Sequence, residues 1–359
     1  MHLTALSHSV KIFCGLIRDN SLYKMHILKK TVNIMDVILS YFSSLNPLTF
    51  VSQLPGNIAQ GVIWGLMGLG VFITYKLLDF ADLSVDGSFA TGGAVTAVLI
   101  IAGVPVWIAV LVALIAGILA GLITGFLHTV LGIPGILAGI LTQIALYSVN
   151  LNIMGKANLP VSYRNYNLLL SASNINLAII IGLALVAVVI AFMYWYFGTE
   201  QGSAIRSTGS NPAMSKAQGI NISTMKVIAL ALSNGLVALS GSLFAQYQGF
   251  ADINMGRGAI VIGLAAVVIG TVIGDGIFRK GMSFTLRLSF VVVGAILYYI
   301  AMGLVLWLKM PTDDTKLFTA AVVAIFLAVP YLKDKSKNSF KKVAKRSAKF
   351  AISGNKEVE

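Results

Sequence analysis

Three aspartates are the residues in this sequence best placed to act through charge. Asp79, Asp82 and Asp86 follow one another at intervals of three and four residues, between two apolar stretches. A carboxylate inside a bilayer is costly, so such residues line water or mark a functional position. At a helix start, however, an aspartate is an ordinary cap, and Asp86 precedes Gly87 and Ser88 as an N-cap would. We favour the capping role, with a direct functional role as the alternative.

The other reactive residue types are isolated. His128 has no second histidine or carboxylate at metal-ligand spacing. The single cysteine, Cys14, excludes an intrachain disulfide. The sequence contains no Gly-x-x-x-x-Gly-Lys-[Ser/Thr] loop for nucleotide phosphates, no serine elbow and no paired-carboxylate motif. We therefore predict no catalytic, cofactor-binding or metal-binding residue in this chain, and we do not expect an enzyme.

The composition is that of a membrane protein. Of 359 residues, 57% are apolar and 11% are charged, against roughly 25% charged in soluble domains. Apolar runs long enough to cross a bilayer as helices recur along the chain. The net charge of +13 does not indicate nucleic-acid binding, because the basic residues fall in loops and in the tail, as the positive-inside rule requires. We predict an all-α polytopic membrane protein.

About nine transmembrane helices are expected, within a membrane domain at 56–332. An N-terminal extension at 1–55 precedes this domain, and a basic cytoplasmic tail at 333–359 follows it. The second and seventh spans are short and rich in glycine, so they are predicted to be short, broken or re-entrant. The basic residues of 1–34 do not fit the orientation that the basic tail predicts (next paragraph). We therefore expect residues 1–34 either to be disordered or to result from a mis-assigned start of the protein. The predicted spans are 57–78, 86–103, 105–130, 133–155, 174–198, 222–248, 258–274, 283–308 and 317–332.

The basic tail fixes an orientation. With the tail inside, counting back across nine spans places the segment 199–221 inside and the loop 156–173 outside.

The chain aligns with itself at an offset of 170 positions. Gly65-Leu66 matches Gly235-Leu236, and Gly93 matches Gly263. The predicted orientation runs the two copies in opposite directions, which makes them inverted repeats. Shared apolar composition is the alternative explanation. The matching connectors are Phe80-Ala81-Asp82 and Phe250-Ala251-Asp252. We expect the aspartates of these connectors to cap or brace the helices that follow them. The candidate connector residues are Phe80, Asp82, Asp86, Phe250 and Asp252.

One long polar segment, 202–226, separates two membrane-length apolar stretches. Within it a short helix is predicted, with Asn211 as N-cap, Pro212 at the first helical position and Gly219 closing the end. A short capped helix at the membrane surface is predicted to be a docking element, and a solvated connector is the alternative. The predicted docking helix consists of Asn211, Pro212, Ala213, Met214, Ser215, Lys216, Ala217 and Gln218, followed by Gly219.

The same segment carries a family resemblance. Arg206-x-Thr208-Gly209-x-Asn211-Pro212, followed by Gly219-Ile220-Asn221 and Lys226, resembles permease subunits of bacterial ABC importers, in the superfamily of branched-chain amino acid and ribose permeases. The connector 78–89 is similar to a subgroup of uncharacterised permeases tied to amino-acid uptake, in some cases of tryptophan or tyrosine. The resemblance covers about residues 55 to 332.

This resemblance implies a permease subunit that moves a small solute, most simply an amino acid, across the bacterial plasma membrane by alternating access. The implied partners are cytoplasmic ATPases that hold ATP and Mg, an extracellular or lipoprotein solute-binding protein, a second permease copy in a homodimer, and the lipid bilayer. No nucleic acid is implied. The helix 211–218 would match the ATPase-coupling helix.

Two other classes of protein are weighed against this one. A secondary transporter driven by an ion gradient would need carboxylates deep inside the spans, whereas the acids here fall at connectors and loops. A channel would present a polar or charged selectivity ring, and none is evident.

Overall fold

A computed structural model describes residues 47–162, 164–278 and 281–308, and eight residues between 317 and 328. The chain divides into two compact units, Met1–Ser52 and Gln53–Glu359. The first unit is described only over 47–52. The extension 1–34, the tail 333–359 and half of the predicted ninth span, 317–332, lie outside the described residues. The domain boundaries at 55 and 332 therefore remain predictions.

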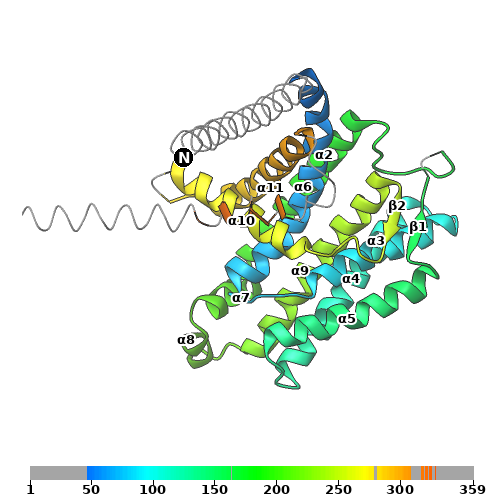
Figure 1. The fold of residues 1–359 in the computed structure, drawn as a ribbon. Coiled ribbons are helices and arrows are strands. Elements are labelled where there is room, and N and C mark those ends of the chain that lie inside the picture. Colours follow the sequence, from blue (N-terminus) through cyan, green and yellow to red (C-terminus); the bar gives the residue numbers. More distant parts are fainter. Residues whose placement is uncertain are drawn as a thin grey trace, which may run out of the picture. The chain divides into compact units, whose positions relative to one another are not determined.

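Eight of the predicted spans correspond to helices (Figure 1). Seven are long and apolar enough to cross a membrane among the described residues, and α3 is a shorter apolar helix of 17 residues. The prediction of an all-α polytopic membrane protein is confirmed. The helices are α2 (Pro47–Phe72, continued by the π-helical turn η1, Ile73–Leu77), α3 (Val85–Ile101), α4 (Val106–Thr129), α5 (Gly135–Met154), α6 (Ile175–Gly198), α9 (Ile222–Gln248), α10 (Ala259–Ile277) and α11 (Phe284–Trp307).

Four shorter elements complete the described fold. Helices α7 (Glu200–Ser210) and α8 (Pro212–Ala217) connect α6 to α9. Strands β1 (Asn158–Pro160) and β2 (Phe250–Asp252) form a two-stranded antiparallel sheet. The sequence predicted neither α7 nor the strands. The sheet joins the loop 156–173 to the second Phe-Ala-Asp connector, and it lies at the opposite end of the helices from α8 in Figure 1.

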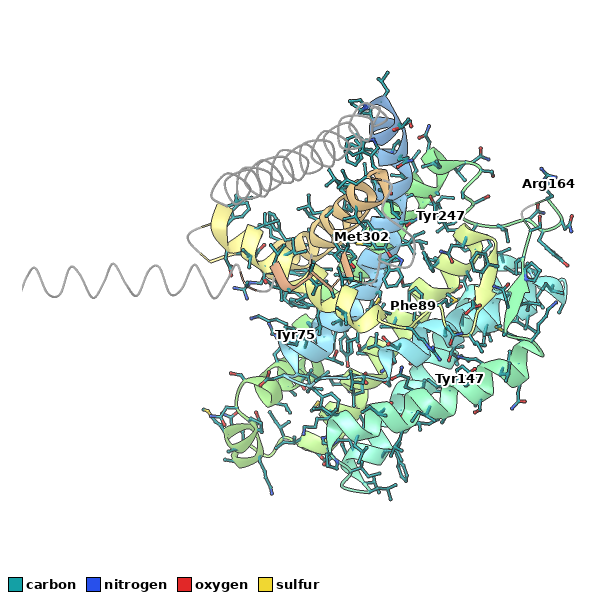
Figure 2. All side chains as sticks on the ribbon, viewed as in Figure 1. Tyr75, Phe89, Tyr147, Arg164, Tyr247 and Met302 are labelled. Carbon is teal, nitrogen blue, oxygen red and sulfur yellow. The ribbon has the colours of Figure 1, made fainter. Side chains whose placement is uncertain are left out.

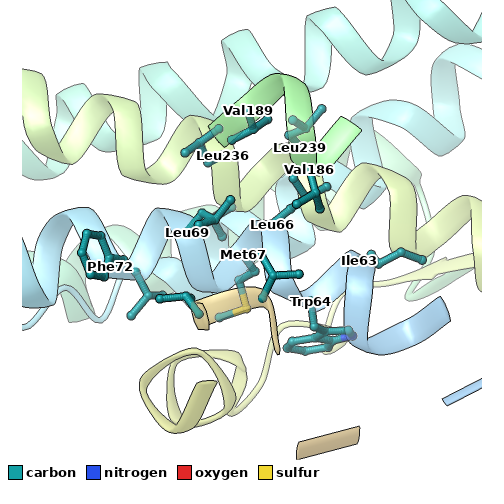
Figure 3. Close-up of a cluster of buried hydrophobic side chains, with 14 of the residues drawn as sticks. Ile63, Trp64, Leu66, Met67, Leu69, Phe72, Val186, Val189, Leu236 and Leu239 are labelled. Atoms are coloured by element: carbon teal, nitrogen blue, oxygen red, sulfur yellow. The ribbon is translucent and has the colours of Figure 1, made fainter. Parts of the chain in front are cut away.

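Helices α2 and α9 form the centre of the helical bundle. In the most apolar stretch of 18 residues of each of these two helices, 83% of the residues are buried. In the other membrane-length helices, less than half of the corresponding stretch is buried. Figure 3 shows Leu66 and Leu69 of α2 facing Leu236 of α9. The outer helices expose their apolar side chains, as expected of surfaces that face lipid.

Contacts between α2 and α9 follow the predicted repeat. The Ser233 hydroxyl donates to the carbonyl of Gly70 at 2.8 Å, and the Ser240 hydroxyl donates to the carbonyl of Ile63 at 2.7 Å. Adding the offset of 170 to residues 63 and 70 of α2 gives residues 233 and 240 of α9, so the repeat maps one hydrogen-bonded pair onto the other. As α9 advances from 233 to 240, its partner on α2 recedes from 70 to 63, so the two helices are antiparallel. This is the reciprocal contact pattern that an inverted repeat produces.

Small residues allow the close approach of neighbouring helices. Gly65 of α2 lies against Val292 of α11, and its repeat equivalent Gly235 of α9 lies against Ile118 of α4. Gly121 leaves no room for a Cβ beside the backbone of α9 at Leu230. The two central helices therefore each bind one outer helix through equivalent glycines.

The helices α3 and α10 begin deep within the bundle. Asp82, just before α3, contacts Asn234, which lies near the middle of the 27-residue α9. The carbonyl of Asp86 lies against Gly256, just before α10. The short second span was predicted correctly. The seventh is a continuous helix of 19 residues, so the prediction of a short or broken helix was wrong there. The segments that precede α3 and α10, at 78–84 and 249–258, are not helical.

Candidate functional site

The predicted helix at 211–218 is present as α8. The Asn211 side chain accepts the Met214 N–H at 3.0 Å, and Pro212 occupies the first turn. Gly219 adopts a left-handed conformation (φ +82°), which a glycine accommodates without strain. Ser215 is buried, whereas Met214 is 59% exposed. The helix thus offers an exposed apolar side chain to a partner, and the coupling role of residues 211–219 remains a prediction.

Helix α7 holds α8 against the membrane bundle. The Thr199 side chain caps α7 by accepting the Gly202 N–H. Gly202, Ile205 and Thr208 are its buried residues. This spacing of three was the signal that could have revealed the helix. Glycine, serine and threonine have low helix propensity, which is why the segment appeared to be a loop.

The contact between α7 and η1 is backbone to backbone. A Cβ at Gly209 would collide with the carbonyl oxygen of Leu77. Beside this contact, Lys76, Asp79 and Arg206 line a cavity of about 420 Å³. Because no side chain separates the two backbones, this contact leaves little room for α7 to move independently of the end of η1.

Asp82 anchors that connector to α9. Its Oδ1 accepts the Ser84 N–H at 2.9 Å and the Ser84 hydroxyl at 2.5 Å, and its Oδ2 accepts the Asn234 amide at 2.7 Å. The Asn234 Oδ1 in turn accepts the Ser88 hydroxyl at 2.6 Å. Asp82 is only 1% exposed. It braces the start of α3, as predicted, and also binds α3 to α9.

The depth of Asp82 corrects one inference from sequence. The aspartates of the first connector were placed at the ends of spans, and a lack of deep carboxylates counted against an ion-driven transporter. Asp82 is instead buried beside the middle of α9. That argument against an ion-driven transporter therefore no longer holds.

The prediction that Asp86 caps the helix that follows it was wrong. Helix α3 begins at Val85 with Ser84 as N-cap, so Asp86 lies in the first turn. Its carboxylate accepts the N–H groups of Gly258 and Ile260, both at 2.9 Å, at the start of α10. A carboxylate at a helix N-terminus satisfies free N–H groups and complements the helix dipole. Asp86 therefore caps α10, not its own helix.

Phe80 and Phe250 have different surroundings. The Phe80 ring lies 5.1 Å from the His128 ring and packs on Gly135. His128 is hydrogen-bonded, with Nε2 3.1 Å from the Lys226 Nζ, in agreement with the structural role expected for a lone histidine. Phe250 in β2 is instead 36% exposed.

Asp252 has a looser role than Asp82. It accepts the Asn254 N–H at 2.7 Å and the Asn158 amide at 3.3 Å. Because α10 begins only at Ala259, Asp252 braces the turn that follows β2, and the prediction that it caps a helix was wrong. Among the described residues, no group of three or more His, Cys, Asp and Glu side chains could hold a metal ion.

Comparisons with known proteins agree with this arrangement. Residues 56–328 match the family described as "Branched-chain amino acid transport system / permease component". The chain is 38% identical over 271 residues to a tyrosine transport system permease protein of Clostridioides difficile (strain R20291), covering 75% of this chain and 88% of that one. It is 32% identical over 272 residues to an uncharacterized protein of Rickettsia prowazekii (strain Madrid E), covering 75% of this chain and 94% of that one. It is 26% identical over 276 residues to a D-allose transport system permease protein of Escherichia coli (strain K12), covering 74% and 81%. This chain therefore belongs to the permease-component family of branched-chain amino acid transport systems.

Proposed function

We propose that this chain is the permease subunit of an ATP-driven importer that carries an amino acid into the cell by alternating access. The substrate class is supported by the relative described as a tyrosine permease, which is 38% identical, whereas the relative described as a D-allose permease is 26% identical. ATP and Mg are proposed to bind on a separate ATPase, with no cofactor in this chain.

The observation that carries the proposal is the exposed helix α8 and its connection to the bundle. Met214 is available to a partner. Gly209 of α7 contacts the backbone of Leu77 directly, and we propose that movement of the α7–α8 pair passes through this contact. The connector then reaches α9 through the Asp82–Asn234 hydrogen bond. A partner that closes on ATP can in this way bias a two-state arrangement of the central helices, with no bond chemistry in the permease.

The proposed assembly contains a second copy of this chain, cytoplasmic ATPase subunits and an extracellular or lipoprotein solute-binding protein. It is proposed to reside in the bacterial plasma membrane, with α8 and the C-terminus on the cytoplasmic side. Exposed apolar side chains near the start of α5, including Ile136 and Leu137, suit contact with lipid or with the second copy.

The docking role of α8 can be tested with a double variant, Pro212→Glu with Ala213→Glu. Two carboxylates and the loss of the proline should prevent the ATPase from seating on α8, because both side chains are exposed and docking would bury two charges that lack a partner. We expect loss of ATPase co-purification and of ATP-dependent uptake, with normal amounts of folded permease. A matched control is Ala172→Glu with Ser173→Glu, two exposed positions far from α8. Normal ATPase co-purification with the α8 variant would contradict the proposal.

An ion-driven secondary transporter is the second candidate, favoured by the buried Asp82. The two are separated in proteoliposomes by supplying ATP while ionophores collapse the ion gradients. The proposed function requires uptake that follows ATP and survives the ionophores. Uptake that stops with the gradient at constant ATP would favour the second candidate.

A further inference from the structure

We infer that a pocket between α3, α5 and the turn 253–258 binds the transported solute as an α-amino acid zwitterion. The inference rests on the proposed function and names a binding position within it. The cavity measures about 350 Å³, within the range of roughly 300–1,000 Å³ usual for small-molecule sites. Its polar lining consists of Asp86, Gln143, Tyr147, Ser148, Asn150 and Arg257.

The pocket extends from the middle of the bundle. Gly87 lies against Gln143, near the middle of the 20-residue α5. Gly256 lies against the carbonyl of Asp86, so the next residue, Arg257, is at a similar depth. Arg257 is nevertheless exposed. A cation at this depth is stable only where water or a counter-charge reaches it, which indicates that the pocket opens into an aqueous path.

Asn150 supplies the strongest sign of a missing ligand. It is 1% exposed, and neither its Oδ1 nor its Nδ2 has a hydrogen-bond partner. A buried amide without partners destabilises a protein, and such groups are rare in folded structures. Gln143, Tyr147 and Asn150 follow one another at i, i+4 and i+7, so they share one face of α5, and Tyr147 can be seen on α5 in Figure 2. A ligand in the pocket would therefore meet a line of polar groups, one of which needs both a donor and an acceptor.

The charges of the pocket match a zwitterion. Arg257 offers a guanidinium, the group best suited to bind a carboxylate through two hydrogen bonds. Asp86 keeps unused lone pairs after accepting two N–H groups of α10, and these can accept an ammonium. The Asn150 Oδ1 can accept from the same ammonium. A neutral sugar offers neither a carboxylate to Arg257 nor an ammonium to Asp86, so the pocket favours an amino acid over a carbohydrate.

The first test is uptake of L-tyrosine by the complete importer, reconstituted with its ATPase and binding protein. Arg257→Gln should lower the uptake rate about tenfold or more through the loss of one charged contact, while ATP hydrolysis continues. Asn150→Leu should do the same, and Arg257→Lys should restore part of the loss. Lys156→Gln removes an exposed cation just beyond the end of α5, outside the pocket, and should leave uptake within twofold. Normal uptake by both Arg257→Gln and Asn150→Leu would overturn the inference.

The second test is independent of uptake. In a Cys14→Ser background, Ile144→Cys places a thiol at the pocket, and Leu119→Cys places one on the exposed face of α4. A charged methanethiosulfonate should label Cys at 144 and not at 119, and L-tyrosine should slow the labelling. Tyramine and 3-(4-hydroxyphenyl)propionate, which each lack one charge, should protect far less. Equal protection by all three would overturn the zwitterion assignment. If the wild-type importer showed no ATP-dependent uptake of any amino acid, the proposed function would fail separately, whatever the labelling result.

Discussion

The two Phe-Ala-Asp connectors have the same three residues and opposite surroundings. In both, the aspartate accepts the backbone N–H two residues later, from Ser84 in one and from Asn254 in the other. Asp82 is buried and bound to Asn234 of the central helix α9. Asp252 instead lies in a short strand and contacts Asn158 of the neighbouring loop.

This difference shows what an internal repeat does and does not determine. The shared residues specify the local turn, because an aspartate side chain binds its own backbone in the same way wherever it stands. The partners differ, because Asp82 binds Asn234 within the second copy of the repeat, whereas Asp252 binds Asn158, which lies between the two copies. The first connector joins α7, and through it α8, to the core, whereas the second joins the loop 156–173 to the bundle. The first connector therefore contacts the segment that carries α8, and the second contacts a surface loop.

The largest expected effect is the loss of stability caused by Asp82→Leu, and Asp252→Leu is the matched comparison. Leucine at 82 leaves the Ser84 N–H and the Asn234 amide buried without their acceptor, and each buried donor left without a partner should cost about 1–3 kcal/mol of stability. Leucine at 252 removes contacts near the surface and should cost about 0.5–1 kcal/mol. Thermal unfolding of the purified permease, together with uptake, measures both. Equal losses at the two sites would mean that the depth of Asp82 has no energetic consequence.

The asparagine variants sharpen the same contrast. From sequence alone, both Asp82→Asn and Asp252→Asn are expected to keep most of the transport activity. The structure changes this expectation for residue 82. An asparagine there offers one acceptor oxygen where two oxygens of Asp82 are used, so either Ser84 or Asn234 loses its acceptor. Asp252→Asn should be close to wild type, and Asp82→Asn should fall between wild type and Asp82→Leu.

A second prediction concerns the contact that links α7 to the first connector. Gly209→Ala places a methyl group against the Leu77 carbonyl, and overpacking of this kind typically costs about 1–3 kcal/mol. We expect ATP-dependent uptake to fall about tenfold while ATPase co-purification persists, since α8 itself is unchanged. Gly198→Ala at the end of α6 has no atom within 4 Å of the added methyl and is the matched control. Unaltered uptake with Gly209→Ala would show that this contact does not transmit movement.

The sequence predicted the parts of this protein that depend on local pattern. Apolar stretches located eight of the helices, and Asn211, Pro212 and Gly219 located α8 because a cap requires only its own neighbours. The depth of Asp82 could not be predicted, because it depends on where the connector returns into the bundle beside Asn234. The cap that Asp86 provides to α10 joins residues 172 positions apart, beyond any local rule. The pocket lined by Asn150 and Arg257 was missed for the same reason, since its members come from three separate segments.

The smallest predicted effect tests the symmetry itself. Ser233→Ala and Ser240→Ala each remove one hydroxyl that donates to a carbonyl of α2, and the two bonds are equivalent under the offset of 170. Interhelical hydrogen bonds of this kind in membranes average about 0.6 kcal/mol, so each variant should lose about that much stability and retain its uptake. The two sites lie about two helical turns apart, roughly 10 Å at 1.5 Å per residue, so the double variant should lose the sum of the two. Unfolding titrations of the single and double variants measure these differences. A loss at one serine more than about 1 kcal/mol larger than at the other, well beyond the average for such bonds, would show that the repeat is symmetric in its contacts but not in its energetics.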